Sequence, residues 1–266
     1  MKMTAWLKGF GKWIALGGAL AFAACSSYVP EGGMAEMAPS AGARDAAKPE
    51  SRTRAAEERP GLATGFGEKV RDPWQKESFV RSSNGPAGTG MIYYNDEDGV
   101  EAMNGYRYKT ESLTQVAGGM VEWGIKGRFG YWPAYRSGGK LFVEGKAGSN
   151  YSIVVKNRCR SRVEVVLSVD GLDVIDGKAA SVRKRGYVIA AGETLEVKGW
   201  RTSWETVAKF EFSSVADSYA NRRHGYTRNV GVIGIAVFGE KGVDPWKWMP
   251  REVNTRQTAN PFAEDP

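Results

Sequence analysis

The sequence predicts a mainly β protein: an antiparallel β-sandwich, jelly-roll or immunoglobulin-like, preceded by a disordered N-terminal tether. Between residues 139 and 240, strand-length runs rich in Val, Ile, Phe and Tyr are separated by turn residues about every ten positions. The 266 residues include 34 glycines, which favours many tight turns over long helices. The chain is 42% hydrophobic, which is enough to bury a core.

The N-terminus has the pattern of an export signal. Residues 1–12 carry three lysines and no acid, and residues 13–24 (WIALGGALAFAA) are apolar or small. A basic region followed by a short apolar run is typical of a secretory signal peptide. The run is too short to span a ~30 Å hydrocarbon layer, for which about 20 residues are needed. Residues 1–24 are therefore predicted to be a signal peptide.

The end of this run carries a resemblance to a known class. Phe22-Ala23-Ala24-Cys25 resembles the lipobox of bacterial lipoproteins, with Phe in place of the usual Leu. The resemblance implies cleavage before Cys25 and acylation of this cysteine, which would anchor the chain stably in a membrane. Ser26 in place of Asp implies sorting to the outer membrane. The alternative is an ordinary secretory signal that is cleaved after Ala24.

Residues 25–70 are predicted to be a flexible tether. They consist mainly of Ala, Gly, Pro, Ser, Glu and Arg and contain few large apolar residues. Such a segment buries too little surface to offset the entropy lost on ordering. A tether of this kind would let a lipid-anchored body stand away from the membrane. The alternative is a binding arm that becomes ordered on a partner.

Residues 71–138 are predicted to be a strand and loop extension of the body. Trp74 and Phe79 supply the first aromatic anchors, and residues 82–90 (SSNGPAGTG) form a cluster of turn residues. Beyond this cluster, short apolar runs alternate with glycines up to residue 135. This pattern is typical of short strands joined by ordered loops.

Residues 139–242 are predicted to form the β-sandwich domain itself. Apolar and polar residues alternate after Arg162, so that one strand face carries Val163, Val165, Leu167 and Val169. Residues 230–238 are apolar nearly throughout, which indicates a central strand buried on both sides. Residues 202–209 (TSWETVAK) could form one short helix, and residues 215–229 are expected to form a long ordered loop.

Residues 243–266 are predicted to be a C-terminal tail. Asp244-Pro245-Trp246-Lys247-Trp248-Met249-Pro250 places two tryptophans between prolines, and a polar end follows. This block is expected to be pinned against the body, with a frayed terminus beyond it. The alternative is that the tryptophans form a docking peptide for another molecule.

The charge of the chain gives weak evidence about partners. The formal charge is +7, but residues 1–24 contribute three lysines and no acid, so the cleaved chain would carry +4. This mild excess falls short of a nucleic-acid footprint, and no nucleic-acid partner is expected. Basic residues gather at 156–162, 183–185 and 222–228. If the fold joins two of these clusters they would form a patch for an anionic ligand, and solvated strand edges explain them equally well.

His224 and Cys159 are the two residues that could take part in nucleophilic catalysis, and the sequence around each argues against it. The only histidine, His224, follows two arginines, and no Gly-x-Ser-x-Gly elbow is present to supply a nucleophile. Cys159 lies among arginines that would lower its pKa if it were exposed, whereas a small buried residue in a strand turn is the favoured interpretation. The protein is therefore not expected to be an enzyme.

Three aspartates at a spacing of three invite a calcium interpretation. Asp170, Asp173 and Asp176 lie in VDGLDVIDG, but successive carboxylates of an extended segment at this spacing point to opposite faces. Asp-Gly pairs are also typical of hairpin turns, which is the favoured explanation. No metal and no cofactor are predicted.

The candidate binding residues are aromatic and basic. Exposed aromatic rings can stack on sugars, and arginines can bind anionic groups. The candidates are Trp132, Trp200, Trp246, Trp248, Arg222 and Arg223.

The C-terminal half, from about residue 150 to residue 238, resembles a domain of uncharacterised bacterial envelope proteins through VDGLDVIDGK and RNVGVIGIAVF. This resemblance implies no activity. The sequence as a whole predicts a lipoprotein anchored in the outer membrane of the cell envelope, with a non-catalytic β-sandwich that binds an envelope component or an assembly partner. Two alternatives remain: a carbohydrate-binding module that uses exposed aromatics, and an enzyme that uses His224.

Overall fold

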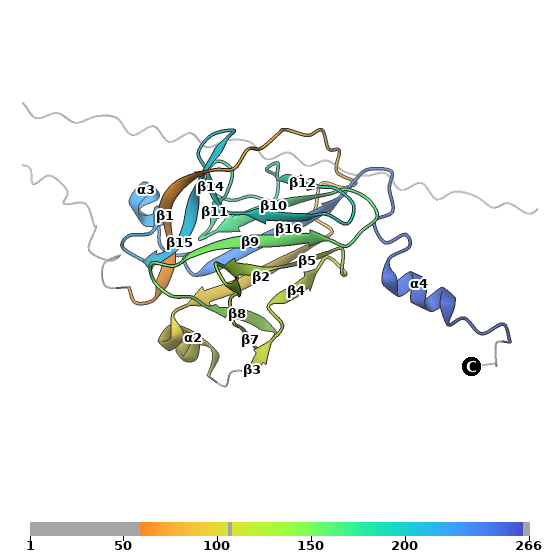
Figure 1. Cartoon of the computed structure of the whole chain (residues 1–266), viewed down its shortest axis with the longest axis horizontal. Helices are drawn as coiled ribbons and strands as arrows, with labels where there is room; N and C mark the ends of the chain where they lie inside the picture. The colour runs from red at the N-terminus through yellow and green to blue at the C-terminus, as the bar shows by residue number, and fades with distance from the viewer. Residues whose placement is uncertain (1–58, 106–107, 263–266) are drawn as a thin grey trace, which may run out of the picture. The chain divides into compact units, whose positions relative to one another are not determined.

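Two β-sheets make up the body of the protein (Figure 1). The structure is a computed structural model, and it describes residues 59–105 and 108–262. The path of the first sheet is β1 (Leu62–Arg71), β15 (Thr206–Ser214), β9 (Asn150–Asn157), β5 (Val121–Gly127) and β4 (Leu113–Val116). Its remaining strands are β13 (Thr194–Val197) beside β9, β14 (Gly199–Arg201) beside β15 and β6 (Gly130–Tyr131) beside β5.

The second sheet also has eight strands. Its path is β11 (Leu172–Asp173), β10 (Val163–Val169), β16 (Val232–Gly239), β2 (Gly88–Asn95), β8 (Lys140–Glu144), β7 (Ala134–Ser137) and β3 (Tyr108–Thr110), and β12 (Tyr187–Ile189) pairs with β10. The predicted mainly β, sandwich-type fold is confirmed.

One pair departs from the predicted antiparallel arrangement. Strands β2 and β8 run parallel, with Ile92 opposite Leu141. A parallel neighbour requires a long crossover connection. Here the chain leaves β2, forms α2 (Glu97–Asn104), adds β3 to the same sheet, contributes β4, β5 and β6 to the other sheet and returns through β7 before it forms β8.

The main core lies between the sheets. The predicted alternation in β10 is confirmed, because Val163, Val165, Leu167 and Val169 all belong to this core. Aromatic rings of the opposite sheet fill its centre: Tyr151 of β9 stacks on Phe212 of β15 with ring centroids 4.5 Å apart. The period-2 pattern of each strand thus determines which side chains are buried.

Strand β16 is buried on both faces, as its continuous apolar run predicts. Ile233, Ile235 and Val237 enter the main core, and Ala236 and Phe238 enter a second, smaller cluster. Phe79 covers this second cluster from the segment that precedes β2. The sandwich is therefore thickened by a third layer over the outer face of β10 and β16.

The predicted tether overlaps the body at its C-terminal end. Residues 62–70 were expected to be flexible, but they form β1, whose register along β15 runs from Leu62 opposite Ser214 to Arg71 opposite Thr206. The prediction is wrong for this part because pairing with a distant strand, β15, supplies the stabilising contacts that the local composition does not. The rest of the predicted tether, up to residue 58, lies outside the described residues, as do the predicted signal peptide and Cys25.

The predicted boundary between a 71–138 extension and a 139–242 sandwich is also not observed. Strand β2 lies between β16 and β8, and β5 pairs with β9, so both predicted parts build the same two sheets. Pairing between strands far apart in the chain produces this arrangement.

Three segments have a secondary structure that differs from the one predicted from the sequence. The predicted helix at residues 202–209 is wrong, because residues 202–206 form a turn and β15 begins at Thr206. The alternation of buried and less buried residues in β15 continues to Phe210 and Phe212, which enter the main core, and this period of two is typical of a strand. The predicted loop 215–229 contains α3 (Tyr219–His224), and the predicted tail contains α4 (Pro250–Gln257).

No helix among the described residues is long and apolar enough to cross a membrane.

Candidate functional site

The C-terminal segment is fixed by local hydrogen bonds after β16 ends. Asp244 Oδ1 accepts a hydrogen bond from the Trp246 backbone N–H at 2.9 Å, which forms an Asx turn ahead of the first tryptophan. The Met249 N–H donates to the Trp246 carbonyl at 3.1 Å and closes a second turn. Two consecutive turns therefore give the tryptophans a defined backbone.

The same segment packs on the turn between β4 and β5, as the sequence predicts. Ala117, Gly118 and Gly119 in this turn all have positive φ angles. A Cβ placed on Gly118 would lie 3.2 Å from the indole nitrogen of Trp246, so glycine is needed both for the backbone and for the close approach. Met249, with 9% of its surface exposed, enters the main core.

Helix α4 follows directly and begins with Pro250, a residue suited to the first position of a helix. None of its residues is buried. Arg256 donates from Nε to Glu252 Oε1 at 2.8 Å, one turn apart, and its guanidinium lies 5.3 Å from the ring centroid of Trp248. The helix is therefore joined to the tryptophan segment through its polar side chains.

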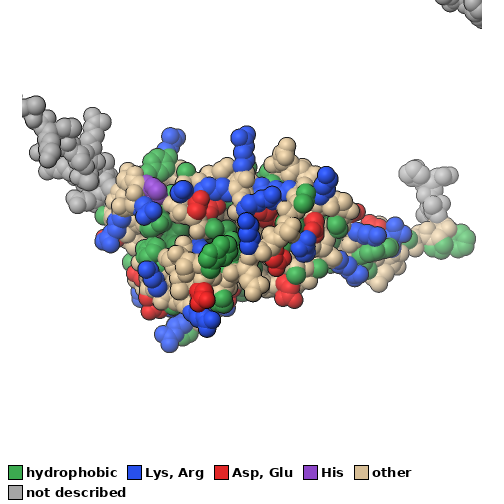
Figure 2. Space-filling model, turned by 90° about the horizontal axis from the view of Figure 1, so that it is seen from above, with side chains coloured by type: hydrophobic (Ala, Val, Ile, Leu, Met, Phe, Trp, Pro, Cys, Tyr) green, Lys and Arg blue, Asp and Glu red, His purple; other side chains and the backbone are tan. Residues whose placement is uncertain are grey.

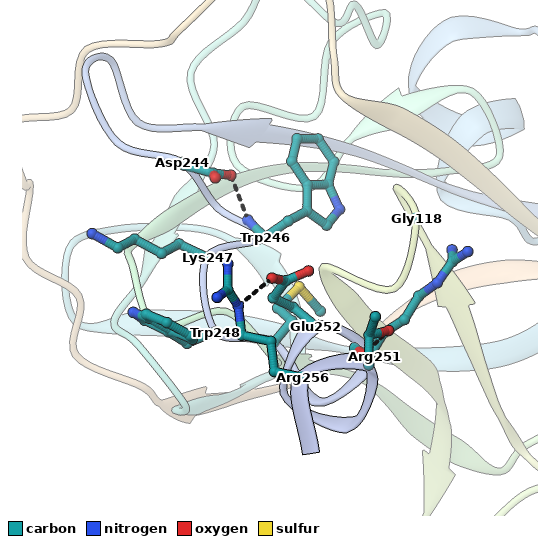
Figure 3. Close-up of a pocket in the computed structure, with 10 residues that line it drawn as sticks. Gly118, Asp244, Trp246, Lys247, Trp248, Arg251, Glu252 and Arg256 are labelled. Atoms are coloured by element: carbon teal, nitrogen blue, oxygen red, sulfur yellow. Dashed lines mark hydrogen bonds and ion pairs between the residues drawn. The ribbon is translucent and has the colours of Figure 1, made fainter. Parts of the chain in front are cut away.

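A groove of about 860 Å³ lies between this segment, α4 and the β4–β5 turn (Figure 3). Its lining residues are Gly118, Asp244, Trp246, Lys247, Trp248, Met249, Arg251, Glu252, Thr255 and Arg256. The exposed fractions of Trp246 and Trp248 are 45% and 43%. Figure 3 shows the two indoles projecting from different sides of the segment, with the Glu252–Arg256 pair between them.

The groove has the chemistry of a binding site. Three basic and two acidic side chains surround two indoles, and no His, Cys or Ser lines it. Trp248 has a φ of 60°, a left-handed conformation that costs a non-glycine residue about 1 kcal/mol. Strained backbone of this kind is concentrated at functional sites.

Two of the predicted binding tryptophans lie elsewhere. Trp200 is 2% exposed, its Nε1 donates to the Gly65 carbonyl at 3.0 Å, and it packs edge-on against Phe210. Its assignment as a binding residue is wrong, because register with β15 places it in the core. Trp132 is half-buried and packs edge-on against Phe212 with ring centroids 5.4 Å apart.

The predicted binding arginines do not join the groove. Arg222 and Arg223 lie exposed in the last turn of α3, where positive charge interacts favourably with the helix dipole. Arg222 also forms an ion pair with Asp217. The structure thus brings together Trp246 and Trp248 but leaves the arginines on a different element.

The groups weighed for catalysis have structural partners. His224 Nε2 lies 2.8 Å from the Gly177 carbonyl, which can only accept, so this nitrogen carries the proton. Ser218, a serine six residues before His224, caps α3 by accepting from the Asn221 N–H. Cys159 is buried, and burial raises the pKa of its thiol to about 11. The lowering expected for an exposed thiol among arginines does not occur.

Asp170 takes the turn role that the sequence favours. Asp170 and Gly171 have φ angles of 53° and 79° and join β10 to β11, with Val169 opposite Leu172. Positive φ at both central residues is the signature of a type I′ hairpin turn. Within the described ranges, no group of three or more His, Cys, Asp or Glu side chains could hold a metal ion.

The sequence analysis did not predict the two arginines of α4 that line the groove. Arg251 and Arg256 fall in a segment predicted to fray at its end, whereas they belong to α4. Two signals in the sequence indicate this helix: a proline at its first position, and Glu252 four residues before Arg256.

Comparisons of the chain with protein-family models, with curated proteins and with solved structures find no match.

Proposed function

We propose that the protein is a non-catalytic binding module of the bacterial envelope, anchored in the outer membrane through acylated Cys25, which holds an envelope component in the groove beside α4. One observation carries the proposal: two half-exposed tryptophans stand on a fixed segment beside a groove that no His, Cys or Ser lines. Tryptophan and arginine are the residues that dominate binding energy at interfaces. The groove offers both types, with Lys247 as a further cation.

The fixed backbone of the segment favours binding further. A partner that covers Trp246 and Trp248 would bury apolar surface without first ordering the chain, because the turns at Asp244 and Trp246 already hold it. Each tryptophan that becomes a hot spot would contribute on the order of 2 kcal/mol.

The anchor rests on the lipobox resemblance of residues 22–25 and has its own test. Cells that express the wild-type chain or Cys25→Ser are labelled with a fatty-acid probe, and the protein is then located by membrane fractionation. We expect label and outer-membrane recovery for the wild type only. Equal labelling of the two chains would contradict the anchor.

The groove is tested by capture from solubilised envelopes with wild type, Trp248→Ala and Trp204→Ala. Trp204 is a matched control because its side chain is 58% exposed and does not line the groove. We expect Trp248→Ala to reduce the captured component at least about tenfold, the loss of one hot spot, and Trp204→Ala to leave it unchanged. A component captured equally by all three chains would contradict binding in the groove.

A carbohydrate ligand is the second candidate, favoured by the exposure of the same two indoles. Sugar rings stack on exposed aromatic faces, and the nearby cations would suit acidic sugars. Saturable binding on a glycan array that disappears in both Trp246→Ala and Trp248→Ala would support this ligand. Saturable binding that survives both substitutions would contradict it.

A further inference from the structure

A second site is suggested by the segment that leads from β1 to β2, far from α4 in the chain. This segment, residues 72–82, crosses the outer face of β10 and β16 and places Phe79 in the smaller apolar cluster. Arg81 follows, and its guanidinium lies 3.5 Å from the ring centroid of Phe238. Figure 2 shows Lys and Arg side chains gathered near the middle of the face seen from above.

A single buried carboxylate holds two guanidiniums side by side at this place. Glu164 of β10, with a side chain 2% exposed, accepts from Arg81 Nε at 2.7 Å, and the same oxygen lies 3.7 Å from Arg185 Nη1. Its other oxygen accepts from the Gly186 N–H at 2.7 Å. Glu164 therefore fixes both arginines while neutralising only one of their charges.

The arginines are held by further contacts with the backbone. Arg81 donates from Nη1 to the Val182 carbonyl at 2.7 Å and from Nη2 to the Lys184 carbonyl. Arg185 donates from Nη1 to the Phe79 carbonyl at 3.0 Å, yet 70% of its side chain remains exposed. A charged group held in one orientation and still open to solvent is preorganised for a ligand.

A cavity of about 520 Å³ opens beside these two guanidiniums. It is lined by Val80, Arg81, Ser83, Asn84, Arg183 and Arg185. The exposed Arg183 has no ion-pair partner in the part of the chain that the structure describes. Three arginines and Glu164 leave a charge of +2.

Two further acids nearby do not line the cavity, and together with Arg162 they carry a net charge of −1. Glu77 and Glu240 both face Arg162, at 3.7 Å and at closer range respectively. Arg162 also lies 5.9 Å from the Phe79 ring, and Arg185 donates to the Phe79 carbonyl, so members of two of the three basic clusters lie near this residue. Because Arg162 faces two acids and does not line the cavity, the cavity draws its positive charge from the 183–185 cluster and from Arg81.

We propose that the Arg81–Arg183–Arg185 cavity binds a phosphoryl group. A phosphomonoester carries a charge of about −1.5 to −2 at pH 7 and has three strong acceptor oxygens, which matches a +2 site with several guanidinium donors. A lone carboxylate would neutralise only half of this charge. The cavity shares no lining residue with the groove beside α4, so this site is independent of the proposed function.

The phosphoryl group could belong to a lipid headgroup or to a free phosphate, and the test separates the two. The full chain in neutral detergent is titrated with inorganic phosphate by calorimetry. In parallel, its binding to vesicles that contain phosphatidic acid is compared with its binding to vesicles of phosphatidylcholine alone. Preference for phosphatidic acid identifies a headgroup, and binding of free phosphate without such a preference identifies a soluble ligand.

The variant Arg183→Gln/Arg185→Gln removes the two exposed guanidiniums and leaves the Arg81–Glu164 pair intact. Arg128→Gln/Arg136→Gln is the matched control, since it removes two exposed arginines from other parts of the chain. We expect the first variant to weaken binding at least about tenfold and the control to stay within about twofold. Arg183→Gln alone repeats the test with a residue that contacts neither Glu164 nor Phe79, should the double variant be unstable.

Two results would overturn the proposal. One is the absence of binding to both phosphate and phosphatidic acid. The other is an equal loss of binding in the control variant, which would mean that net charge alone attracts the anion.

Discussion

A chain of buried polar groups joins the two sheets at the level of single residues. The Tyr94 hydroxyl donates to Asp170 Oδ1 at 2.6 Å, so Thr64 Oγ1, 2.7 Å away, must donate its proton to Tyr94. Tyr151, 2.7 Å from the same Thr64 oxygen, is then the donor to Thr64. Every hydroxyl is satisfied, as buried polar groups require, and the chain ends at the Asp170 carboxylate.

The titration of Asp170 gives the prediction at this scale. Burial is the main cause that raises the pKa of this carboxyl from 3.8 to about 6, against the hydrogen bonds it accepts. The folded state therefore prefers the neutral acid, so its contribution to stability is full below pH 4 and is lost as the pH rises through 6. The loss is on the order of 3 kcal/mol, at about 1.4 kcal/mol per pKa unit.

The measurement is the free energy of unfolding in denaturant from pH 4 to pH 8, for wild type and Asp170→Asn. Asparagine tolerates the positive φ of this turn and does not titrate. We expect the advantage of the wild type over the variant to shrink by about 2.5 kcal/mol across this range, because part of it is already lost at pH 4. A wild-type advantage that stays constant with pH would contradict the raised pKa of Asp170.

At the scale of elements, the strands with a strong local pattern could be predicted and β1 could not. The core face of β10 and the double burial of β16 follow from their own sequences. Strand β1 (LATGFGEKVR) buries Ala63, Thr64 and Gly65, which are too small to give an apolar pattern. Its partners are distant: the Thr64 N–H donates to Asp170, and the Gly65 carbonyl accepts from Trp200.

The candidate site shows the same limit. Trp246, Trp248 and Trp200 all stood out by residue type, but composition does not distinguish a core tryptophan from an exposed one. Register against β15 buries Trp200, whereas the turns after Asp244 leave Trp246 and Trp248 half-exposed. The strand register and the distant Gly65 carbonyl, which accepts from the Trp200 Nε1, make the distinction.

Removal of β1 gives the prediction at the scale of elements. A chain that begins at residue 60 keeps the strand, and one that begins at residue 72 loses it together with the donor to Asp170 and the acceptor for Trp200. We expect the first to melt cooperatively. The second should lose at least about 5 kcal/mol, comparable with the whole stability of a typical domain. Thermal melts followed by circular dichroism decide this, and similar melting temperatures would contradict an integral β1.

At the scale of the whole molecule, early and late parts of the chain interleave. Strand β2 fills the space between β16 and β8, and β5 lies directly beside β9. Most pairings join residues far apart in sequence, such as Ile92 with Ile233. Contacts of this kind lower the free energy only after the entropy of closing long loops has been lost, which favours slow and cooperative folding.

The interleaving predicts that no part of the sandwich folds alone. Residues 139–242, predicted from sequence as a separate domain, would leave β16 without β2 and β9 without β5 when excised, and would expose the core faces of both strands. We expect this fragment to lack near-ultraviolet circular dichroism and dispersed amide resonances. Residues 60–266 should instead unfold in one transition, with equal calorimetric and van't Hoff enthalpies. A folded 139–242 fragment, or two separate transitions in the longer chain, would mean that the third layer and the early strands are additions to an independent core rather than parts of it.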